Sequence, residues 1–468
     1  MILGWEVDDQ CRPSYWLSSE QKPALPPPDN QVVVVSPENI DTNLIVVAQS
    51  GSGKSTFLGR YVEEIILRTQ ARCLILDPDG DFRFVNKVES KTLWEEAAYN
   101  RQKKKGKLPT ESSPEDFEKS WKAKSIAIRT NSPGKKKAPY EQLRIWWPYV
   151  QYEFLAEGLD AIQKTWFHSC HNFVKLVAKV VRNPKGEPIK IDVLEEAHKM
   201  LKKQKSGKPV EADFLALVRD SLKGSKTRLK ESYWKTQLEK SLAALDGIPP
   251  NIEDYYFARA RELRGGVLST RTPKPAKPRP RIDVVDLSTV HGRDLRLLVA
   301  NTVLSQLWDD TIAEVEGSAI ASAVRASRVP TFVIVDEAHN FVPEIPQSGL
   351  EERLKEQFRR IAAEGRKYAL FLVLVTQRPD KIDSFVLSEC DNKVVMKLNS
   401  EQVMGLVSEK LGLGGTVAEW WGRVSPFGIG CVMFIGRCFP KGPKIFYSAA
   451  RRTEEGGASL QPESWAHP

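Results

Sequence analysis

The chain has 468 residues, a formal net charge of +9 at pH 7, 41% hydrophobic residues and 28% charged residues. These values are ordinary for a soluble globular protein, and the length allows one elaborated domain or two smaller ones. No apolar run approaches the roughly 20 residues that a membrane-spanning helix needs, and the acidic first nine residues exclude a secretion signal. We therefore expect a cytoplasmic protein whose six cysteines, which lack any paired spacing, are reduced thiols.

The first regular elements surround a glycine- and serine-rich loop. Residues 1–42 are irregular and contain a cluster of prolines, after which 44–48 form an apolar strand that leads into the loop. Helical spacing of apolar residues continues to residue 66, and 73–76 form a second strand. This order of strand, loop, helix and strand predicts the start of a parallel α/β sheet.

The alternation then stops for about two hundred residues and resumes after a proline-rich basic linker at 271–281. Between these points we expect helix and loop, with aromatic-rich helical stretches at 146–159 and 166–181. After the linker we expect strands at 284–287, 332–335, 371–375 and 394–398, helices at 293–314, 351–366 and 401–411, and a terminal hairpin of 430–435 with 444–448.

These patterns predict the domain organisation. An α/β core comprises 43–90 and 282–450, preceded by an N-terminal extension at 1–42, interrupted by a mostly helical insertion at 91–281 and followed by a polar tail at 451–468. We predict an α/β fold with a largely parallel sheet and a helical insertion.

The loop after the first strand meets the Walker A pattern except at its first glycine, where Ala48 stands. In such a loop the backbone N–H groups and the helix N-terminus surround phosphates. Lys54 would bridge the β and γ oxygens, Ser55 would ligate Mg²⁺, and Thr56 would reach the α-phosphate. The predicted nucleotide contacts are Gln49, Ser50, Gly51, Ser52, Gly53, Lys54, Ser55 and Thr56.

The strand at 332–335 ends in two adjacent carboxylates, Asp336 and Glu337. This is the arrangement that ATP hydrolysis requires: Asp336 would hold Mg²⁺ through water, and Glu337 would orient and deprotonate the attacking water. Adjacent acids also occur in ordinary strand-end turns. After a Walker A loop and an apolar strand, the catalytic interpretation is favoured, with ATP and Mg²⁺ as cofactors. We therefore predict that the fold is a RecA-like P-loop NTPase with a largely parallel sheet and a helical insertion, in which 43–90 and 282–450 form the ATPase core.

Four segments together resemble the HerA branch of the HerA–FtsK ATPases, and they occur in the order found in that family. They are Asp77-Pro78-Asp79-Gly80-Asp81, the run from Val335 to Phe341, Ala363-Glu364-Gly365-Arg366-Lys367-Tyr368, and Val375-Thr376-Gln377-Arg378-Pro379. The resemblance covers 43–82 and roughly 283–449. It implies that Gln377 is the polar sensor of the γ-phosphate and that Arg366 is the arginine finger directed at the ATP of a neighbouring subunit, with Lys367 and Arg378 as rivals for that role.

The resemblance also implies a homo-hexameric ring that acts on DNA, together with a separate nuclease or other effector partner and a role in phage defence. HerA proteins carry a small β-barrel before the phosphate loop, and the 48 residues before Gln49 are too few to build it. Two other functions remain open: a nucleotide-dependent ring that only assembles an effector, and a secretion or conjugation ATPase. The absence of a membrane segment from the sequence and the block Gln377-Arg378-Pro379 argue against the secretion or conjugation ATPase.

Basic charge is concentrated in two stretches. Residues 101–140 contain twelve Lys or Arg against four Asp or Glu, and residues 199–235 contain eleven against four. Such clusters suit a DNA backbone, and they also suit a solvated helix face or loop.

Three motifs contain histidine. The residues at 168–171 are expected to pack between helices rather than to form a metal site, and 195–198 lacks the residue order of a metal-binding motif. His339 is expected either to support Glu337 or to have a packing role.

Overall fold

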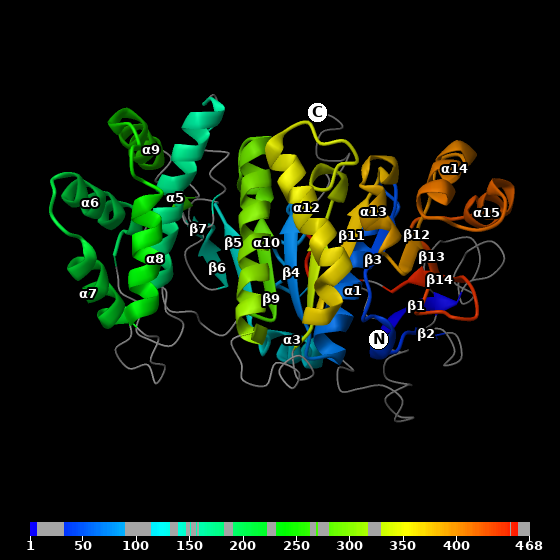
Figure 1. Cartoon of the computed structure of the whole chain (residues 1–468). Helices are drawn as coiled ribbons and strands as arrows, with labels where there is room; N and C mark the ends of the chain where they lie inside the picture. Colours follow the sequence, from blue (N-terminus) through cyan, green and yellow to red (C-terminus); the bar gives the residue numbers. More distant parts are fainter. Residues whose placement is uncertain are drawn as a thin grey trace, which may run out of the picture. The chain divides into compact units, whose positions relative to one another are not determined.

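A computed structural model describes residues 1–6, 32–88, 114–131, 139–146, 150, 156, 159–181, 191–221, 231–262, 268–269, 280–316, 329–449 and 451–456. The chain divides into two compact units (Figure 1). The first comprises Met1–Gln142, Pro280–Gly292 and Asp309–Pro468, and the second comprises Leu143–Arg279 and Arg293–Trp308. The second unit is therefore inserted into the sequence of the first. Helix α10 (Arg293–Glu316) contributes residues to both.

The first unit is built on one twelve-stranded sheet formed by its described residues. In spatial order the strands are β2 (Val32–Val34), β1 (Ile2–Glu6), β14 (Lys444–Ser448), β13 (Cys431–Ile435), β12 (Asn392–Val395), β3 (Leu44–Val47), β11 (Leu370–Thr376), β10 (Thr331–Val335), β4 (Arg72–Asp77), β9 (Ile282–Asp286), β5 (Ile126–Thr130) and β6 (Tyr140–Gln142). From β12 to β6 every pairing is parallel, whereas β13, β14, β1 and β2 add antiparallel strands at one edge.

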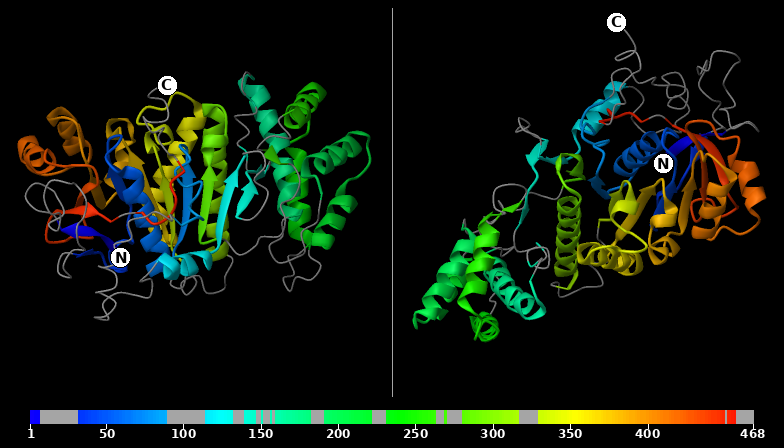
Figure 2. Two further views of the ribbon diagram at one scale, coloured as in Figure 1. Left: turned by 180° about the vertical axis from the view of Figure 1, so that it is seen from behind. Right: turned by 90° about the horizontal axis from the view of Figure 1, so that it is seen from above.

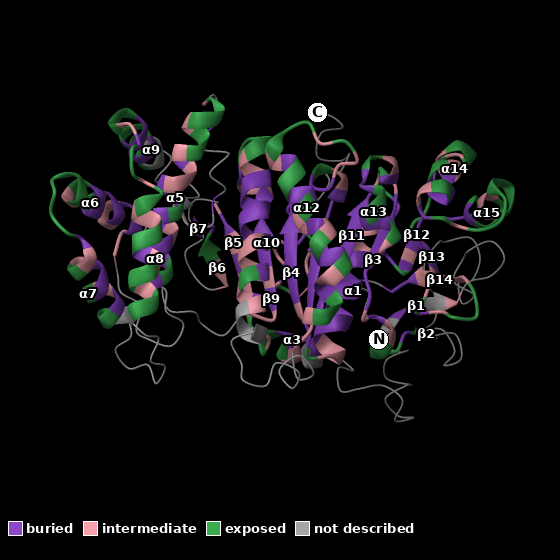
Figure 3. Ribbon diagram, viewed as in Figure 1, coloured by how far each residue is buried: buried purple, intermediate pink, exposed green. Residues whose placement is uncertain are grey.

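The central strands are short apolar runs because both faces of the sheet are covered. On one face the side chains of strands β3, β4, β10 and β11 pack with α1 (Lys54–Arg68) and α3 (Pro114–Lys122), in a core that includes Phe57, Tyr61 and Trp121. Figure 2 shows α12 (Gly349–Glu364) and α13 (Ser384–Ser388) on the opposite face. The buried colour of these strands in Figure 3 follows from this double cover.

The order of the central strands determines which of the predicted site residues lie near one another. Strand β11 lies between β3 and β10, so the phosphate-loop strand and the Asp336–Glu337 strand are separated by the strand that ends at Thr376. The carboxyl ends of the three parallel strands meet at one edge of the sheet. The order β12, β3, β11, β10, β4 is that of a RecA-like P-loop fold, and the predicted fold class is confirmed.

The second unit consists mainly of helices. They are α5 (Ala161–Val181), α6 (Val193–Lys205), α7 (Glu211–Ser221), α8 (Glu231–Ala243), α9 (Pro250–Glu262) and the first part of α10, with a small parallel pair of β7 (Ile145–Trp146) and β8 (Leu268–Ser269). Asp192 is the N-cap of helix α6, and its side chain accepts hydrogen bonds from the backbone N–H groups of Leu194 and Glu195.

The predicted packing role of the histidine motif at 168–171 is supported. His171 is fully buried on α5, and its Nδ1 lies 2.9 Å from the hydroxyl of Tyr256 on α9. His198 stacks on Phe257 with ring centroids 4.1 Å apart. Across the described segments, no group of three or more His, Cys, Asp or Glu residues is arranged to hold a metal ion.

The segment between 91 and 281 differs from its predicted content in two places. Strands β5 and β6 extend the main sheet beyond β9, although their residues lie in the stretch expected to be helix and loop. Strand β5 is short and only partly buried, and β6 has three residues of which Glu141 and Gln142 are exposed, so the apolar signal of both is weak. The predicted helix at 146–159 is wrong where the structure describes it: Trp146 is in β7, and Val150 and Ala156 are not helical. The rest of that stretch lies outside the described residues.

Residues 1–42, which were expected to be irregular, contribute β1 and β2 to the antiparallel edge of the main sheet. These strands have only five and three residues, so their sequence signal is weak. The strands and helices expected after the linker overlap observed elements, although β12 covers Asn392–Val395 rather than 394–398, and the terminal strands β13 and β14 pair as an antiparallel hairpin. Helix α12 ends at Glu364, and Arg366 lies in a short 3₁₀ helix, η6 (Gly365–Tyr368). Helix α14 (Glu401–Lys410) precedes α15 (Val417–Val424). No helix in the described ranges is long and apolar enough to cross a membrane.

The start of the segment expected to be a polar tail is packed against the ATPase core. Arg451, Arg452 and Thr453 are buried, and one carboxylate oxygen of Glu63 accepts hydrogen bonds from the backbone N–H of Arg452 and Thr453, both at 2.8 Å. The Arg451 guanidinium donates to the carbonyl of Asp81 at 3.0 Å. We call residues 451–456 the C-terminal strap. The polar sequence of the strap did not predict its burial, because its buried contacts are made with charged side chains and backbone groups rather than with apolar side chains. The remainder of the predicted tail, 457–468, lies outside the described residues.

Candidate active site

The phosphate loop connects the end of β3 to the start of α1. Gly51 and Gly53 have φ of +70° and +92°, a conformation that favours glycine. Gly53 precedes Lys54, the first residue of α1, so the unpaired N–H groups of the helix face the loop. The loop is also held from outside, since the N–H of Gly430 donates to the carbonyl of Ser52 at 2.8 Å. The arrangement is that of an anion-binding loop.

Lys54 connects this loop to the end of β10. Its Nζ lies 2.9 Å from Oδ1 of Asp336 and 2.5 Å from Oε1 of Glu337. Burial acts to lower the pKa of Lys54, but the two carboxylates outweigh it and the pKa is raised. Lys54 is therefore a firmly charged ammonium at the point where the sequence predicts phosphate oxygens.

Asp336 and Glu337 occupy different electrostatic environments. Asp336 is completely buried, and burial raises its pKa to about 6 despite the opposing charge of Lys54. Burial also acts to raise the pKa of Glu337, but Lys54 and a hydrogen bond from Gln377 reverse the effect and the pKa is lowered. Glu337 has φ of +45°, an unusual conformation for a residue with a side chain and one that clusters at functional sites.

Gln377 follows β11 and donates a hydrogen bond from Nε2 to Oε1 of Glu337 at 2.7 Å. His339 completes the surroundings of this carboxylate. Its Nδ1 lies 3.4 Å from Oε2 of Glu337 and 3.1 Å from the hydroxyl of Thr376. Burial lowers the pKa of His339, which favours a neutral ring. Of the two roles considered for His339, the contacts favour support of Glu337.

The oxygens available near Ser55 suit a hard divalent cation. The Ser55 hydroxyl is hydrogen-bonded to Oδ2 of Asp81. Oδ2 of Asp336 is buried and has no hydrogen-bond partner among the described residues. Mg²⁺ prefers oxygen ligands and retains several waters, so a serine hydroxyl with a nearby carboxylate fits it. The donor set therefore fits Mg²⁺.

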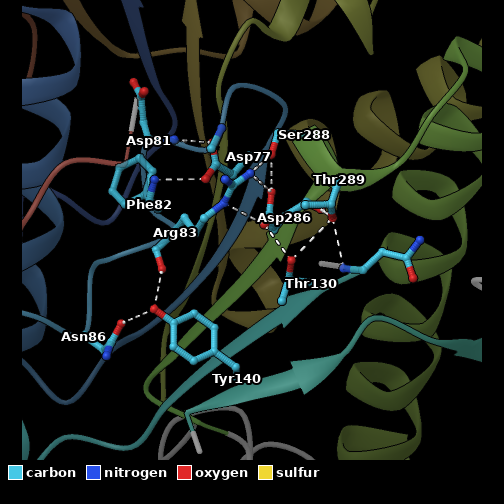
Figure 4. A network of polar contacts seen from close by, with 12 residues as sticks. Asp77, Asp81, Phe82, Arg83, Asn86, Thr130, Tyr140, Asp286, Ser288 and Thr289 are labelled. Atoms are coloured by element: carbon cyan, nitrogen blue, oxygen red, sulfur yellow. Dashed lines mark hydrogen bonds and ion pairs between the residues drawn. The ribbon is translucent and has the colours of Figure 1, made fainter. Parts of the chain in front are cut away.

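The loop that carries Asp81 is shaped by the buried carboxylate of Asp77 (Figure 4). Asp77 accepts hydrogen bonds from the backbone N–H of Gly80 at 2.8 Å, Asp81 at 3.1 Å and Phe82 at 2.9 Å. Burial raises the pKa of Asp77 to about 7, against the effect of these donors. This loop holds Asp81 beside Ser55.

The same loop is tied to the strand ends on its other side. Arg83 donates from Nε to Oδ2 of Asp286 at 3.1 Å, and Thr130 donates from its hydroxyl to the same oxygen at 2.8 Å (Figure 4). Tyr140 donates to the carbonyl of Arg83 at 3.3 Å. These residues come from the ends of β9 and β5 and the start of β6. The sequence offered no signal for this network, because its members are isolated polar residues far apart in the chain.

The three candidate finger residues lie at different places. Arg366 and Lys367 are in η6, which precedes β11, so they lie at the amino edge of the parallel strands. Gln377 is at the other end of the same strand, about 23 Å away along seven extended residues. Arg378 follows Gln377 at the carboxyl edge and is 3.6 Å from Asp380. The structure thus brings Lys54, Asp336, Glu337 and Gln377 into contact with one another, whereas Arg366 lies at the opposite edge of the sheet.

A family model described as "Helicase HerA, central domain" matches residues 29–307, more than half of the chain. The chain belongs to the HerA central-domain family. A second model, for the ATPase family associated with various cellular activities, matches residues 290–398. With the geometry above, these matches establish a P-loop ATPase, as the sequence predicted.

Individual relatives match this HerA-family chain over shorter segments. "Probable helicase MJ1565" of Methanocaldococcus jannaschii is 32% identical over 130 residues, which is 25% of each chain. "DNA double-strand break repair helicase HerA" of Pyrococcus furiosus is 34% identical over 91 residues, 19% of this chain and 15% of the relative. The match therefore spans a quarter or less of the length of these two curated relatives.

Two solved structures are similar to the HerA-family chain over most of its length. VirB4 of Thermoanaerobacter pseudethanolicus has 13% sequence identity and a TM-score of 0.48, covering 96% of each chain. The plasmid coupling protein TrwB in complex with ADP and Mg²⁺ has 12% identity and a TM-score of 0.43, covering 89% of this chain and 88% of TrwB.

Proposed function

We propose that this HerA-family ATPase hydrolyses Mg²⁺-bound ATP to move DNA, and that it does so as a homo-hexameric ring. One observation supports the ring above the others: Arg366 lies at the far end of β11 from Gln377, about 23 Å from the residues around its own phosphate loop. An arginine finger at that position serves only the ATP of another subunit. Head-to-tail contacts that repeat around a closed ring provide such an arrangement.

Each residue of the phosphate loop and strand ends has a distinct part in the proposed reaction. The backbone from Gln49 to Gly53 surrounds the phosphates, Lys54 moves from its carboxylate partners to the β and γ oxygens, and Thr56 lies one residue beyond Ser55 toward the α-phosphate. Ser55 and Asp336 would hold Mg²⁺, which neutralises phosphate charge when it is bound.

Glu337 is the proposed base. Its lowered pKa keeps it ionised at neutral pH, so it can accept a proton from water. Gln377 and His339 contact its two oxygens, and Gln377 is the proposed sensor of the γ-phosphate because it contacts the proposed base. The transition state then receives positive charge from Lys54 within the subunit and from Arg366 of the neighbour.

The two basic stretches are the candidate surfaces for DNA contact. In the second basic stretch, several described lysines are paired with acids of neighbouring helices: Lys203 is 2.6 Å from Asp213, and Lys235 is 2.9 Å from Glu211. This pairing favours the solvated-helix interpretation there. The lysines at 103–105 lie outside the described residues and remain the candidates for DNA contact.

The experiment that tests the motor is ATP turnover with and without DNA at several salt concentrations. A motor is expected to hydrolyse ATP faster when DNA is added, and the stimulation is expected to fall as salt rises. A ring that only assembles an effector would bind nucleotide without stimulation by DNA. Unchanged turnover over the full range of DNA concentration would reject the motor and favour that alternative.

A partner is part of the proposal. The family resemblance supports a separate nuclease or another effector, and a role in antiviral defence. A test for a nuclease that co-purifies with this chain, followed by a test of phage resistance with and without Glu337→Gln, examines both points. Resistance that is indifferent to this substitution would remove ATP hydrolysis from the proposed defence role.

A further inference from the structure

Two arginines share one carboxylate at the amino edge of the sheet. Nη2 of Arg366 lies 3.5 Å from Oδ2 of Asp41, and Nη1 of Arg437 lies 3.2 Å from Oδ1 of the same side chain. Asp41 precedes β3, Arg366 precedes β11, and Arg437 follows β13. Because β13 runs antiparallel to β12, its end lies at the same edge as the beginnings of β3 and β11.

The backbone around Arg437 is fixed on both sides. Gly436 has φ of +125°, and a Cβ there would lie 2.2 Å from the carbonyl oxygen of Asp391, so this residue must be glycine. On the other side, the N–H of Cys438 donates to Oδ1 of Asn392 at 3.1 Å. The Asn392 amide in turn donates to the hydroxyl of Thr42 at 2.8 Å. Arg437 is thereby positioned relative to the segment that contains Asp41.

The two guanidinium groups are necessarily close together. Since each contacts one oxygen of the same carboxylate, the contacting nitrogens are at most about 9 Å apart. The Arg366 side chain is 64% exposed and that of Arg437 is 40% exposed, so both are accessible from outside the subunit. Two guanidinium charges against one carboxylate leave a net positive charge at this edge.

We propose that Arg437 is a second arginine that acts in trans, contacting the triphosphate of the neighbouring subunit together with Arg366. The proposal rests on the proposed function, in which Arg366 reaches that ATP. A triphosphate is several ångströms long and carries its charge on many oxygens, so a second guanidinium this close to Arg366 can contact it as well. Asp41 is the common counter-ion that keeps the two arginines together.

A competing role for Arg437 is purely structural, joining the end of β13 to the loop before β3. The two roles differ in what they change. A trans contact strengthens in the transition state, so its loss lowers kcat while ATP binding and thermal stability stay nearly constant. A structural contact at a surface ion pair changes stability slightly and leaves kcat nearly unchanged.

The experiment compares Arg437→Ala, Arg437→Lys and Arg366→Ala with a control, Arg423→Ala, which removes an exposed arginine on α15. Nucleotide affinity, Tm and kcat are measured for each. Arg437→Ala is expected to lower kcat by about 10- to 100-fold with affinity changed less than about threefold, and Arg437→Lys is expected to recover part of the loss. Arg423→Ala is expected to match wild type.

Mixed rings locate the effect. Subunits with Arg437→Ala, whose turnover is expected to be strongly reduced, are combined with subunits carrying Glu337→Gln, which are expected to be inactive. If Arg437 acts in trans, a Glu337→Gln subunit supplies its intact arginines to an Arg437→Ala subunit, and turnover rises above that of rings with Arg437→Ala alone. Mixed rings that form but turn over no faster than rings with Arg437→Ala alone would overturn the proposal.

The outcomes separate this proposal from the one on which it rests. If Arg366→Ala is inactive and Arg437→Ala retains at least half of wild-type kcat, Arg437 is not a second trans arginine. If Arg366→Ala itself is fully active, the trans mechanism of the proposed function fails first.

Discussion

Gln377 and Lys54 both hold Oε1 of Glu337, at 2.7 and 2.5 Å. Lys54 lies at the junction of the phosphate loop and α1, and Gln377 lies after the end of β11. The carboxylate of the proposed base therefore contacts both segments. If phosphate oxygens attract Lys54, as we propose, the hydrogen bond from Gln377 would still orient Glu337 after its charge partner has moved.

Glu337→Gln and Lys54→Ala are expected to abolish turnover in different ways. Glu337→Gln keeps the side-chain shape and removes the base, so ATP is expected to remain bound with kcat reduced by a factor of 100 or more. Lys54→Ala removes a phosphate contact and weakens nucleotide binding as well. Equilibrium binding of a fluorescent ATP analogue and single-turnover hydrolysis distinguish the two. Near wild-type turnover by Glu337→Gln would show that another group is the base.

The C-terminal strap is expected to stabilise the core through Glu63. Three hydrogen bonds converge on Oε1 of Glu63, from the N–H of Arg452, the N–H of Thr453 and the hydroxyl of Thr453. Glu63 is fully buried, so Glu63→Ala would leave these donors without their acceptor. We expect the free energy of unfolding to fall by about 2–4 kcal/mol, measured by urea denaturation.

The matched control for this variant is Glu38→Ala, which removes an exposed carboxylate and is expected to change stability by less than about 0.5 kcal/mol. Equal stability of the two variants would mean that the strap is not held by Glu63. A loss of stability in both would point to a general effect of charge.

The buried thiols are expected to resist alkylation in the native protein. Burial raises the pKa of Cys73, Cys170, Cys390 and Cys438 to about 12. A raised pKa means that the reactive thiolate is scarce until the pH approaches 12, and burial also blocks the reagent. Iodoacetamide at pH 8 followed by mass spectrometry of peptides is expected to leave all four unmodified. The same treatment in urea is the control and is expected to modify them. Rapid native labelling of any of the four would contradict its burial.

The sequence predicts the central sheet well and the polar contacts around it poorly. Apolar runs at 44–48, 73–76, 332–335 and 371–375 are long enough to identify β3, β4, β10 and β11. The Walker A pattern and the acidic pair predict that nucleotide binds at the carboxyl ends of these strands. These elements are predictable because burial on both faces requires uniformly apolar strands.

The parts that the sequence did not predict depend on residues whose local signal is polar. Strand β5 is only partly buried and β6 is mostly exposed, and the C-terminal strap is buried through Glu63 rather than through apolar side chains. Asp41 contacts Arg366 and Arg437, and each of these arginines is hundreds of positions away from Asp41 in the sequence. Such contacts can be predicted only when the strand order is known, because polar contacts between distant segments produce no periodic pattern in the sequence.

The last prediction concerns Lys103, Lys104 and Lys105, which belong to the first basic stretch and lie outside the described residues. If they contact DNA, replacing all three with glutamine removes up to three phosphate contacts. The slope of log affinity against log salt is then expected to become shallower by up to about 2.7, and affinity is expected to fall for every DNA sequence tested. ATP turnover without DNA is expected to be unchanged, because none of the three is among the residues proposed for hydrolysis.

The matched control replaces Lys87, Lys410 and Lys441 with glutamine, which removes the same charge outside both basic stretches. A general effect of net charge would change both triple variants equally, whereas a specific DNA contact changes only the first. Affinities measured at four or more salt concentrations decide the matter. Superimposable lines for wild type and the 103–105 variant would exclude this stretch from the DNA path. An unchanged slope together with lost binding of an effector protein would instead assign the stretch to a protein partner, since counterion release accompanies phosphate contacts.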